Sequence, residues 1–451
     1  MALPSVTPYL AGLSAKIDGA LSADDLTKAE TCLLDWCAVA LAATDDPLMR
    51  LMRDQAAAEG GHPQGSFLGT TTRGSAAQAA LINGTASHLY DYDDGATSIP
   101  GHPTVPVGSA VWALGEREGA SGRTVLAAFI LGVEVMCRLG RALKPQHYAA
   151  GWHASGTLGA IGAAVACAKL LGLDEQRTTW AIGLAACRAA GLKAVFGSSA
   201  KPLQLGHAAA LGLQSADLAA RGFDCAPDVL ETAKGFLELH APTFNPEPVL
   251  APLAAPLAIR EVRFKRHAAC FLTHAPAEAS LQFKRAHNDA VETIKRIRIV
   301  GNPEVKTVCG NWTPNTGLAF KFSAPMVVAA ALSGVDTGAL ATFNDHTARD
   351  PKLRALAAKV EIETDVAMGQ EHAHLIFETL DGNAYELEGR AGQGPTDAAT
   401  DRTSLLPKVR ALVRPLYGEA ATESLIAAFG GLHMAARLPD IAPLTVRAAA
   451  E

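Results

Sequence analysis

Residues 91–104 bring three carboxylates and a histidine into one short stretch, DYDDGATSIPGHPT. The carboxylates are Asp91, Asp93 and Asp94, and the histidine is His102, directly before a proline. Carboxylates beside a histidine can bind a metal ion, can form an acid/base pair without a metal, or can be the polar end of a helix followed by a loop. The remainder of the chain has to distinguish these three alternatives.

Three further segments contain side chains that could do chemistry. Residues 146–160 hold two histidines among glycines, residues 193–210 hold a lysine before a proline at a predicted helix start, and residues 263–279 hold a basic cluster. A single histidine is more often structural than catalytic, so each candidate needs support from its surroundings. The candidates are His147, His153, Lys201, Lys265, Arg266, His267 and His274.

The charges of Lys201 and of the three aspartates lie at the unfavourable ends of predicted helices. A helix N-terminus favours anions and a C-terminus favours cations. Lys201 lies at a predicted start, whereas the DYDD run lies at a predicted end. Charges placed against the helix dipole indicate function rather than stability. Lys201 therefore suits an anion-binding site.

The sequence lacks several motifs that would define a cofactor or a nucleophile. It contains no HExxH zinc motif, no GxGxxG or GxxxxGK[ST] phosphate loop and no GxSxG nucleophile motif. His372 and His374 share one face of a predicted strand and could hold zinc as a pair, but no third ligand is indicated. What remains is a metal-free pocket of Asp, His, Lys and Arg. In such a pocket, cations bind a small polycarboxylate while a histidine moves a proton at the adjacent carbon.

The residues up to about 255 show one helical pattern after another. Residues 23–44 place Leu26, Leu33 and Leu41 at helical spacing, and Ser22 is suited to cap that helix. Small residues dominate the faces, so the helices can approach closely and form a multi-helix core. Further helices are predicted at 75–94, 104–119, 122–143 and 200–222.

A proline-rich stretch at residues 245–262 marks a change in pattern. Strands are predicted beyond it at 291–301, 358–364 and 374–390, with helices at 321–334, 350–359, 404–413 and 421–433. The last of these strand segments reads as a hairpin around Asp381-Gly382-Asn383. We therefore predict a mainly α fold, with an all-helical domain from residues 1–258 and 397–451 and a smaller α+β domain from residues 259–396.

Composition and charge restrict the class of protein. The 451 residues are 49% hydrophobic and 19% charged, which suits two or three folded domains. A net charge of −6 argues against nucleic acid as a partner, because its binding needs a basic surface. The apolar stretches at 126–137 and 156–173 are short or carry a charge, which favours buried helices over a membrane span. Eight cysteines without a CxxC pair, and an N-terminus without a signal-peptide pattern, predict a cytoplasmic protein.

Five segments, in chain order, resemble those of the MmgE/PrpD superfamily: NGTASHLYDYDDGATSIPGHPT, GWHASGTLGAIGAA, AKPLQLGHAA, FKRHAACFLTHAPAEA and KFSAPM. The superfamily includes 2-methylcitrate dehydratase, cis-aconitate decarboxylase and iminodisuccinate epimerase. The resemblance implies a large helical domain with an α+β lid domain inserted into it. It also implies a homodimer, and an active site between the two domains that needs no cofactor and no metal.

The resemblance also implies roles for individual residues. His102 and His153 would be the acid/base pair, and Asp91 would orient or polarise one of them. Lys201 and Lys265 would bind the carboxylates of the substrate. The other expected substrate-binding residues are Arg266, His274 and Gly95.

Two positions depart from the family pattern. Gly95 stands where the decarboxylase and several relatives have threonine, and Met326 stands where a tyrosine often follows the proline. Both departures remove a polar group, which argues against cis-aconitate or methylcitrate as the substrate. The segments PGHPT and HYAAGWHASGTLG are closest to the epimerase-like branch.

The expected function is a cofactor-free lyase or isomerase that abstracts a proton next to a carboxylate of a small di- or tricarboxylate. Dehydration, decarboxylation and epimerisation share a carbanion-like intermediate, so the sequence leaves all three open. Two alternatives from other classes remain. One is a non-catalytic carboxylate-binding protein on the same fold, and the other is a metal-dependent hydratase that uses the cluster at residues 91–94.

Overall fold

The computed structural model describes residues 5–96, 98–392 and 397–445. The chain divides into two compact units. The first comprises residues 1–89, 93–263 and 395–451, and the second comprises residues 90–92 and 264–394. The boundaries predicted from the sequence are 258/259 and 396/397, and the latter adjoins residues 393–396, which lie outside the described part. The grouping of residues 90–92 with the smaller unit was not predicted.

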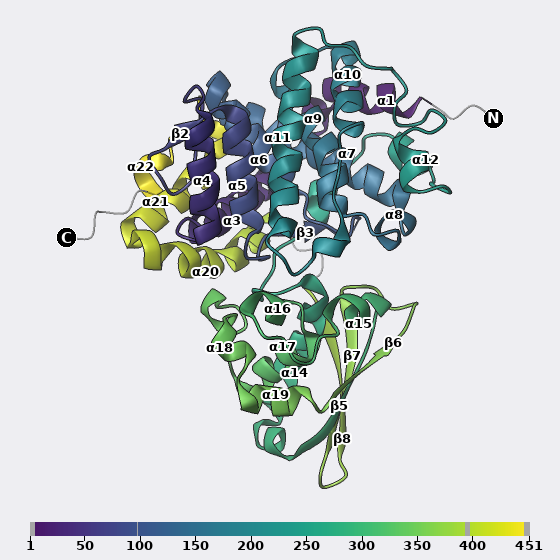
Figure 1. The fold of residues 1–451 in the computed structure, drawn as a ribbon, viewed down its shortest axis with the longest axis vertical. Coiled ribbons are helices and arrows are strands. Elements are labelled where there is room, and N and C mark those ends of the chain that lie inside the picture. Colours follow the sequence, from purple (N-terminus) through teal and green to yellow (C-terminus); the bar gives the residue numbers. More distant parts are fainter. Residues whose placement is uncertain (1–4, 97, 393–396, 446–451) are drawn as a thin grey trace. The chain divides into compact units, whose positions relative to one another are not determined.

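The first unit is built almost entirely of helices (Figure 1), as expected for a mainly α fold. Its α-helices are α1 (Val6–Gly12), α2 (Ile17–Ala20), α3 (Ala23–Ala42), α4 (Pro47–Glu59), α5 (Ala76–His88), α6 (Thr104–Glu118), α7 (Gly122–Leu143), α8 (Gln146–Ala149), α9 (Ala154–Leu170), α10 (Glu175–Ala186), α11 (Ala200–Ala220), α12 (Phe236–His240), α13 (Glu247–Leu250), α20 (Ala398–Tyr417), α21 (Glu419–Gly430) and α22 (Ala442–Thr445). Short 3-10 helices are η1 (Leu13–Ala15), η2 (Lys193–Val195), η3 (Ala258–Glu261) and η7 (Leu432–Met434).

Local sequence signals fix where the major helices begin. The predicted cap of α3 is confirmed: the Ser22 hydroxyl accepts a hydrogen bond from the Asp25 backbone N–H, and the Asp25 carboxylate accepts one from the Ser22 backbone N–H. Ser75 and Gln78 form the same reciprocal arrangement at the start of α5. Each pair satisfies two N–H groups that a helix leaves without partners.

Helix α11 packs against both α5 and α9 in the core of the helical unit. The crossing with α5 depends on two glycines in contact. A Cβ on Gly206 would lie 2.2 Å from the carbonyl oxygen of Leu81, and a Cβ on Gly84 would lie 2.8 Å from the Cα of Gly206. The absence of side chains at this crossing lets the two backbones come close enough to position the ends of α5 and α11.

Two pairs of two-residue strands complete the helical unit. β1 (Gly65–Ser66) pairs antiparallel with β2 (Arg73–Gly74), and β3 (Gly95–Ala96) pairs antiparallel with β4 (Val262–Arg263). The second pair ties the loop after α5 to a segment more than 160 residues further along the chain. It therefore holds that loop in place between α5 and α6.

The second unit is a four-stranded sheet with helices. The strands are β5 (Ile294–Gly301), β6 (Val360–Thr364), β7 (His372–Thr379) and β8 (Ala384–Arg390), in the order β6-β5-β7-β8. β5 pairs parallel with β6 and antiparallel with β7, and β7 and β8 form the predicted hairpin. The helices are α14 (His274–Ala286), α15 (Pro303–Cys309), α16 (Gly317–Lys321), α17 (Ala324–Ser333), α18 (Asp345–Ala348) and α19 (Pro351–Ala357), with 3-10 turns η4 (Phe271–Thr273), η5 (Asn288–Thr293) and η6 (Leu340–Thr342).

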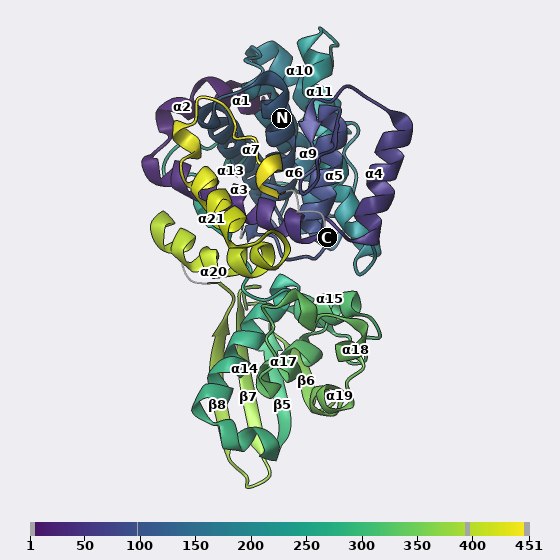
Figure 2. The same cartoon turned by 90° about the vertical axis from the view of Figure 1, so that its left-hand side faces the viewer.

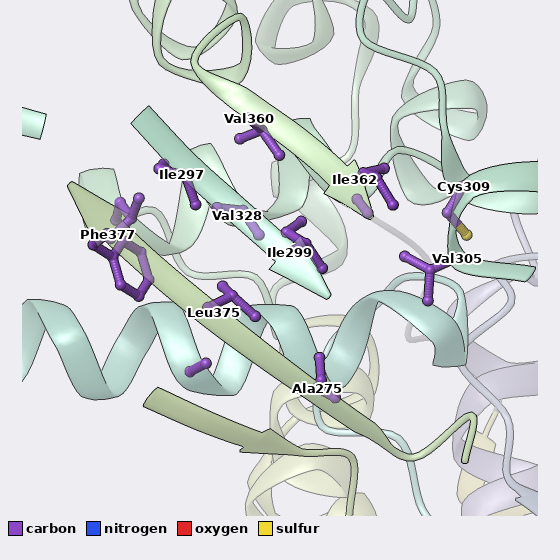
Figure 3. Packing of buried hydrophobic residues seen from close by; sticks show 14 of the residues in the cluster. Ala275, Ile297, Ile299, Val305, Cys309, Val328, Val360, Ile362, Leu375 and Phe377 are labelled. Carbon is purple, nitrogen blue, oxygen red and sulfur yellow. The ribbon is translucent and has the colours of Figure 1, made fainter. Parts of the chain in front are cut away.

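One face of this sheet carries the hydrophobic core of the second unit. Helix α14 packs on β7 and β8 and also contacts α17 (Figure 2). Ile297 and Ile299 from β5 and Leu375 and Phe377 from β7 lie in one buried cluster with Val328 of α17 (Figure 3). Along β5 and β7, buried residues alternate with mostly half-buried ones, which matches the period of two expected of a strand with one buried face.

The predicted helices at 104–119, 122–143 and 200–222 agree with α6, α7 and α11 to within two residues at each end. The helix predicted at 75–94 was too long, because α5 ends at His88 and the DYDD run lies beyond it. Among the residues that the structure describes, no helix combines the length and the apolar character needed to cross a bilayer.

Candidate active site in the helical unit

The loop between α5 and α6 is shaped by short backbone contacts that fix His102. The Ala96 N–H donates to the Gly101 carbonyl at 3.2 Å, which folds the loop back on itself. Gly101 then approaches α9 so closely that a Cβ there would lie 2.7 Å from the Ser155 hydroxyl oxygen. That hydroxyl accepts a hydrogen bond from the His102 backbone N–H at 2.9 Å. The start of α9 therefore anchors the backbone of His102.

Contacts at Nδ1 determine the tautomer of the His102 ring. Nδ1 lies 2.6 Å from the backbone carbonyl oxygen of Asp94 and 3.0 Å from Oδ2 of Asp93. A carbonyl oxygen can only accept, so Nδ1 carries the proton. In the neutral ring the lone pair is then on Nε2. The His102 side chain is 13% exposed, so part of this ring is accessible to solvent.

Asp93 is shared between two imidazole rings. Its carboxylate lies 2.8 Å from Nδ1 of His88, the last residue of α5, as well as 3.0 Å from Nδ1 of His102. Burial alone would raise the pKa of Asp93, but His102 and His88, through their charge and hydrogen bonds, hold it well below its usual value. Burial lowers the pKa of His88 to about 4, and the Asp93 charge only partly opposes this. The pair at neutral pH is therefore an ionised Asp93 and a neutral His88.

His153 lies immediately before α9 and is held as a neutral ring. Its Nδ1 is 2.6 Å from Oε1 of Gln204, whose amide nitrogen donates to the Leu192 carbonyl at 3.3 Å. This orientation of the amide makes Nδ1 the protonated nitrogen of His153. Burial, followed by the positive charge of Lys201, lowers the pKa of His153 well below its usual value.

Lys201, in the first turn of α11, supplies the positive charge of this cluster. It is buried, with Nζ 5.2 Å from the centroid of the Phe196 ring. The His153 ring packs edge-on against the same phenylalanine, with centroids 4.8 Å apart. The His88 ring is centred 4.5 Å from His102 and 6.3 Å from His153. The structure thus brings together His102, His153 and Lys201, three of the residues predicted for the site.

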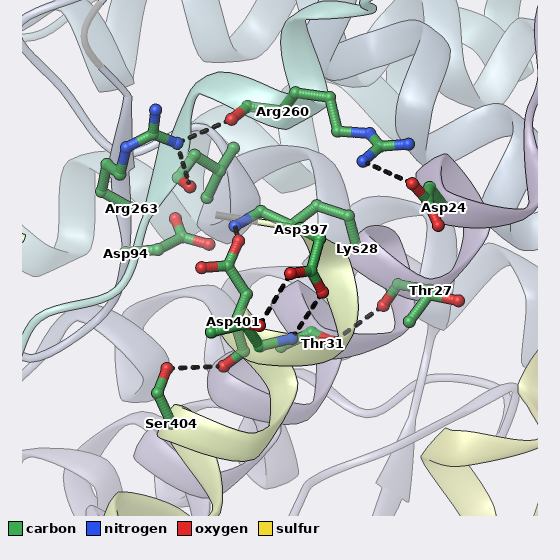
Figure 4. A network of polar contacts seen from close by, with 12 residues as sticks. Asp24, Thr27, Lys28, Thr31, Asp94, Arg260, Arg263, Asp397, Asp401 and Ser404 are labelled. Carbon is green, nitrogen blue, oxygen red and sulfur yellow. Dashed lines mark hydrogen bonds and ion pairs between the residues drawn. The ribbon is translucent and has the colours of Figure 1, made fainter. Parts of the chain in front are cut away.

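Asp94 faces away from the histidines into a buried polar network. Its carboxyl accepts a hydrogen bond from the Thr104 hydroxyl at 2.5 Å. Burial, followed by the nearby charge of Asp35, raises the pKa of Asp94 well above its usual value. Figure 4 shows Asp94 in this network, in which Lys28 of α3 is paired with Asp401 of α20. This shift favours the protonated form of Asp94, whereas the lowered pKa of Asp93 favours a negative charge beside His102.

Asp91 and Lys265 contact each other within the second unit. The Lys265 ammonium donates to the backbone carbonyl of Asp91 at 2.6 Å and lies 3.1 Å from its carboxylate. Lys321 donates to the carbonyl of Tyr90 at 2.6 Å, and the Tyr92 hydroxyl donates to the carbonyl of Arg266 at 3.0 Å. Residues 90–92 are thus bound to the rest of the second unit through both backbone carbonyls and side chains. The predicted roles of Asp91 in orienting a histidine and of Lys265 in binding a carboxylate stay predictions.

The remaining basic candidates of the second unit form their own cluster. His267 and His274 pack edge to face with centroids 4.9 Å apart, and Nε2 of His274 lies 3.2 Å from the Ala269 carbonyl. Burial, followed by the neighbouring His267, lowers the pKa of His274 well below its usual value. Arg266 is 3.5 Å from Glu278. These contacts leave the predicted binding roles of Arg266 and His274 as predictions.

Several candidates lie outside the histidine cluster. His147 is buried, with Nε2 3.0 Å from the Thr157 hydroxyl, and its ring is stacked with that of His240 at 5.6 Å. His372 and His374 lie on β7 beside glutamates, 3.6 Å from Glu371 and 2.7 Å from Glu388 respectively. Neither belongs to a group of three or more metal-binding side chains among the described residues.

The donor atoms of His88, Asp93 and His102 lie within 4.8 Å of one another, a spacing at which three side chains can hold a metal ion. Their hydrogen bonds favour another interpretation. Both Nδ1 atoms point at the same carboxylate, and Nδ1 of His102 also contacts a carbonyl oxygen that only an N–H can satisfy. This donor set fits proton-carrying imidazoles better than metal ligands, which would have to give up these protons.

The sequence did not single out His88, and it indicated Asp93 only as one of the three carboxylates in residues 91–94. The signal that could have identified them is a histidine followed five residues later by an aspartate of the DYDD run. Gly95 lies in β3 with intermediate exposure, and a Cβ there would meet only the Gly101 carbonyl oxygen at 3.5 Å. Met326 is fully buried in the first turn of α17.

The structure is a mainly helical protein with a candidate acid/base site of histidines, an aspartate and a buried lysine. Comparison with known sequences gives its family. Residues 14–249 match the MmgE/PrpD N-terminal domain, and residues 267–430 match the MmgE/PrpD C-terminal domain. The chain belongs to the MmgE/PrpD family.

Similar proteins include cis-aconitate decarboxylases. One from Aspergillus terreus is 28% identical over 399 residues, which cover 81% of this chain and 80% of the relative. The Homo sapiens protein is 31% identical over 302 residues, covering 63% of this chain and 61% of the relative. The Mus musculus protein is 27% identical over 371 residues, covering 77% and 74%.

Proposed function

We propose that this protein is a cofactor-free lyase that acts on a small di- or tricarboxylate by moving a proton at a carbon next to a carboxylate. Membership of the MmgE/PrpD family and similarity to cis-aconitate decarboxylases support the reaction class. The single observation that carries the proposal is the tautomer of His102. Its protonated Nδ1 faces Asp94 and Asp93, which makes Nε2 the atom that can accept a proton.

The two histidines differ in how well they can hold an added proton. His102 lies 3.0 Å from the ionised Asp93, which stabilises an imidazolium ring. His153 contacts the neutral amide of Gln204, and burial together with Lys201 opposes its protonation, which lowers its pKa. In our proposal His102 is the base, and His153 remains neutral and orients the substrate. Lys201 stabilises the negative charge that develops on a substrate carboxylate.

This assignment accounts for either direction of proton transfer. In a dehydration, Nε2 of His102 takes the proton from carbon, the electron pair of that bond forms a double bond, and hydroxide leaves. The imidazolium of His102 then gives up its proton, which converts the hydroxide to water. In a decarboxylation, the carbon–carbon bond breaks, carbon dioxide leaves, and the remaining electron pair takes a proton from the imidazolium. Both reactions need one histidine that can carry a proton next to a cation that binds the carboxylate.

The test is turnover of a substrate panel in deuterium oxide, followed by NMR. The panel contains citrate, 2-methylcitrate, cis-aconitate and iminodisuccinate. We expect loss of water or carbon dioxide from at least one compound, with deuterium incorporated at carbon. Deuterium exchange without elimination would instead identify an epimerase. Absence of both turnover and exchange across the panel would reject the proposal in favour of a binding protein.

A variant pair tests the role of His102. His102→Asn should lower kcat by about 10²- to 10⁴-fold, the usual contribution of general acid–base catalysis. The matched control is His433→Asn, because His433 also contacts a carboxylate, that of Glu30 at 2.7 Å, in the same unit. The control should keep wild-type turnover. Equal activity in both variants would exclude His102 as the base.

A further inference from the structure

We propose that Asp93 and His88 are positioning residues that hold His102 as a base, with the Asp93 carboxylate shared between the two imidazole rings. This inference rests on the proposed function and extends it to two residues that act through His102. Asp93 and His88 have side chains that are 1% and 0% exposed, against 13% for His102. Buried in this way, they act on a substrate through the more exposed ring.

Two oxygen atoms contact Nδ1 of His102, and they have different effects on the ring. The Asp94 backbone carbonyl, 2.6 Å from Nδ1 of His102, is sufficient to fix the tautomer of the ring. The Asp93 carboxylate, 3.0 Å from the same nitrogen, adds a negative charge. When His102 takes up a proton, the ring and Asp93 become an ion pair in a buried setting. Loss of the Asp93 charge should therefore reduce basicity while leaving the tautomer intact.

His88 keeps Asp93 in the orientation that faces His102. Its Nδ1 lies 2.8 Å from Oδ1 and 2.9 Å from Oδ2 of Asp93, which restrains rotation of the carboxylate. Because burial lowers the pKa of His88 to about 4, the ring adds a hydrogen bond without adding a competing positive charge at neutral pH. A neutral donor at this position preserves the full charge of Asp93 for His102.

The charges around His102 within the helical unit are consistent with this division of roles. Lys201 contributes a positive charge from α11, and His153 from the start of α9 is neutral because burial and Lys201 lower its pKa. Burial and the nearby charge of Asp35 raise the pKa of Asp94, which favours its protonated form. The Asp93 carboxylate, whose pKa is lowered, supplies negative charge next to Nδ1 of His102.

Asp93→Asn tests the charge while preserving the size of the side chain. We expect kcat to fall by about 10²-fold or more with KM changed less than threefold, because the substrate contacts remain. The acid limb of the pH profile of kcat/KM should move to lower pH by about one unit or more, as expected when an adjacent negative charge is removed. A purely structural role would lower stability without moving this limb.

His88 is tested by a loss variant and a conservative variant. His88→Leu removes the donor to Asp93 and should lower kcat by about tenfold or more. His88→Gln can still donate an N–H to the carboxylate and should recover most of that loss. Equal activity of His88→Leu and the wild-type protein would overturn the role of His88.

Glu30→Gln is the matched control for the loss of a buried carboxylate beside a histidine. Glu30 is 3% exposed and lies 2.7 Å from Nδ1 of His433, elsewhere in the helical unit. This variant should lower the melting temperature without altering kcat or the pH profile. If Asp93→Asn behaves like Glu30→Gln in all three measurements, the proposal is wrong.

An NMR titration separates this inference from the proposed function. In full-length protein with ¹⁵N-labelled histidine, the His102 resonance is assigned by its loss in His102→Asn. Its titration midpoint should lie at lower pH in Asp93→Asn than in the wild-type protein by about one unit or more, with or without turnover. An unchanged midpoint would overturn the inference, whereas a shifted midpoint in a protein that turns over no substrate would overturn only the proposed function.

Discussion

His147 and His153 lie six residues apart in one predicted segment and are both buried, but they contact different neighbours. His147 is 3% exposed, and its ring contacts Thr157 and His240. Burial, followed by the nearby His240, lowers the pKa of His147 to about 3. The folded protein therefore holds His147 neutral at pH values where an unfolded chain would protonate it. The stability of the folded protein should therefore decrease at low pH because of His147.

Stability from the neutral His147 ring should be fully present above about pH 6.5 and should fall as the pH drops towards 3. The sign follows because the unfolded state binds more protons in that range. The contribution is at most about 1.4 kcal/mol per pH unit. His147→Gln should flatten the decline of the melting temperature between about pH 6.5 and pH 4, measured by circular dichroism. The exposed His62→Gln is the control, and an equal slope in both variants would contradict the assignment.

At the residue scale, the sequence indicated most side chains of the candidate site but not all of the contacts between them. His102, His153 and Lys201 were predicted and lie together, whereas His88 was missed. Asp91 and Asp93 are chemically equivalent in the sequence, and only the backbone path after α5 separates them. The chain leaves its helix at His88, and Asp91 adopts a left-handed backbone with φ of 52°. Such a turn depends on tertiary contacts that no local pattern encodes.

At the scale of elements, the crossing of α5 and α11 links packing to the site. α5 ends at His88, and α11 begins one residue before Lys201, so both side chains depend on how the helices meet. Gly206→Ala would place a methyl group 2.2 Å from the Leu81 carbonyl oxygen, which forces the helices apart. We expect a loss of about 1–3 kcal/mol in unfolding free energy, as for overpacked cores.

The same variant should also lower kcat, because separation of the helices displaces Lys201 from the histidines. Urea unfolding and turnover on the best substrate of the panel measure the two effects. Gly19→Ala in α2 is the control, because a Cβ there meets nothing within 4 Å. It should be neutral or slightly stabilising, as alanine has the higher helix propensity. A Gly206→Ala protein as stable as the control would refute the close crossing.

Helices and strands were predictable where a local pattern and a cap coincide. Ser22 with Asp25 marks the start of α3, and Asp381-Gly382-Asn383 marks the hairpin of β7 and β8. The predicted helix at 75–94 overran α5, because the sequence offers no glycine or proline at its end. The two-residue pair of β3 and β4 was not predicted, since so short a contact depends on segments distant in sequence.

At the scale of the whole molecule, the chain leaves the helical unit and returns to it after the α+β unit. The returning helix α20 packs on α3, and this contact involves charges as well as apolar residues. Lys408 of α20 lies 2.6 Å from Asp35 of α3, with side chains 8% and 0% exposed. Lys28 of α3 pairs with Asp401 of α20 in the same region (Figure 4). Helical patterns in the sequence indicated the returning segment, but its ionic docking requires the folded structure.

Lys408→Met should destabilise the helical unit by about 3–5 kcal/mol, because it leaves the buried Asp35 without its lysine partner. Arg410→Met, two residues along α20, removes the more exposed pair with Glu423 and should change stability little. Urea unfolding and the rate of proteolysis within residues 398–417 provide the two measurements. The double variant Asp35→Leu with Lys408→Met removes both charges and should recover much of the lost stability. If Lys408→Met costs no more than Arg410→Met, the buried ion pair does not hold the C-terminal segment on the helical unit.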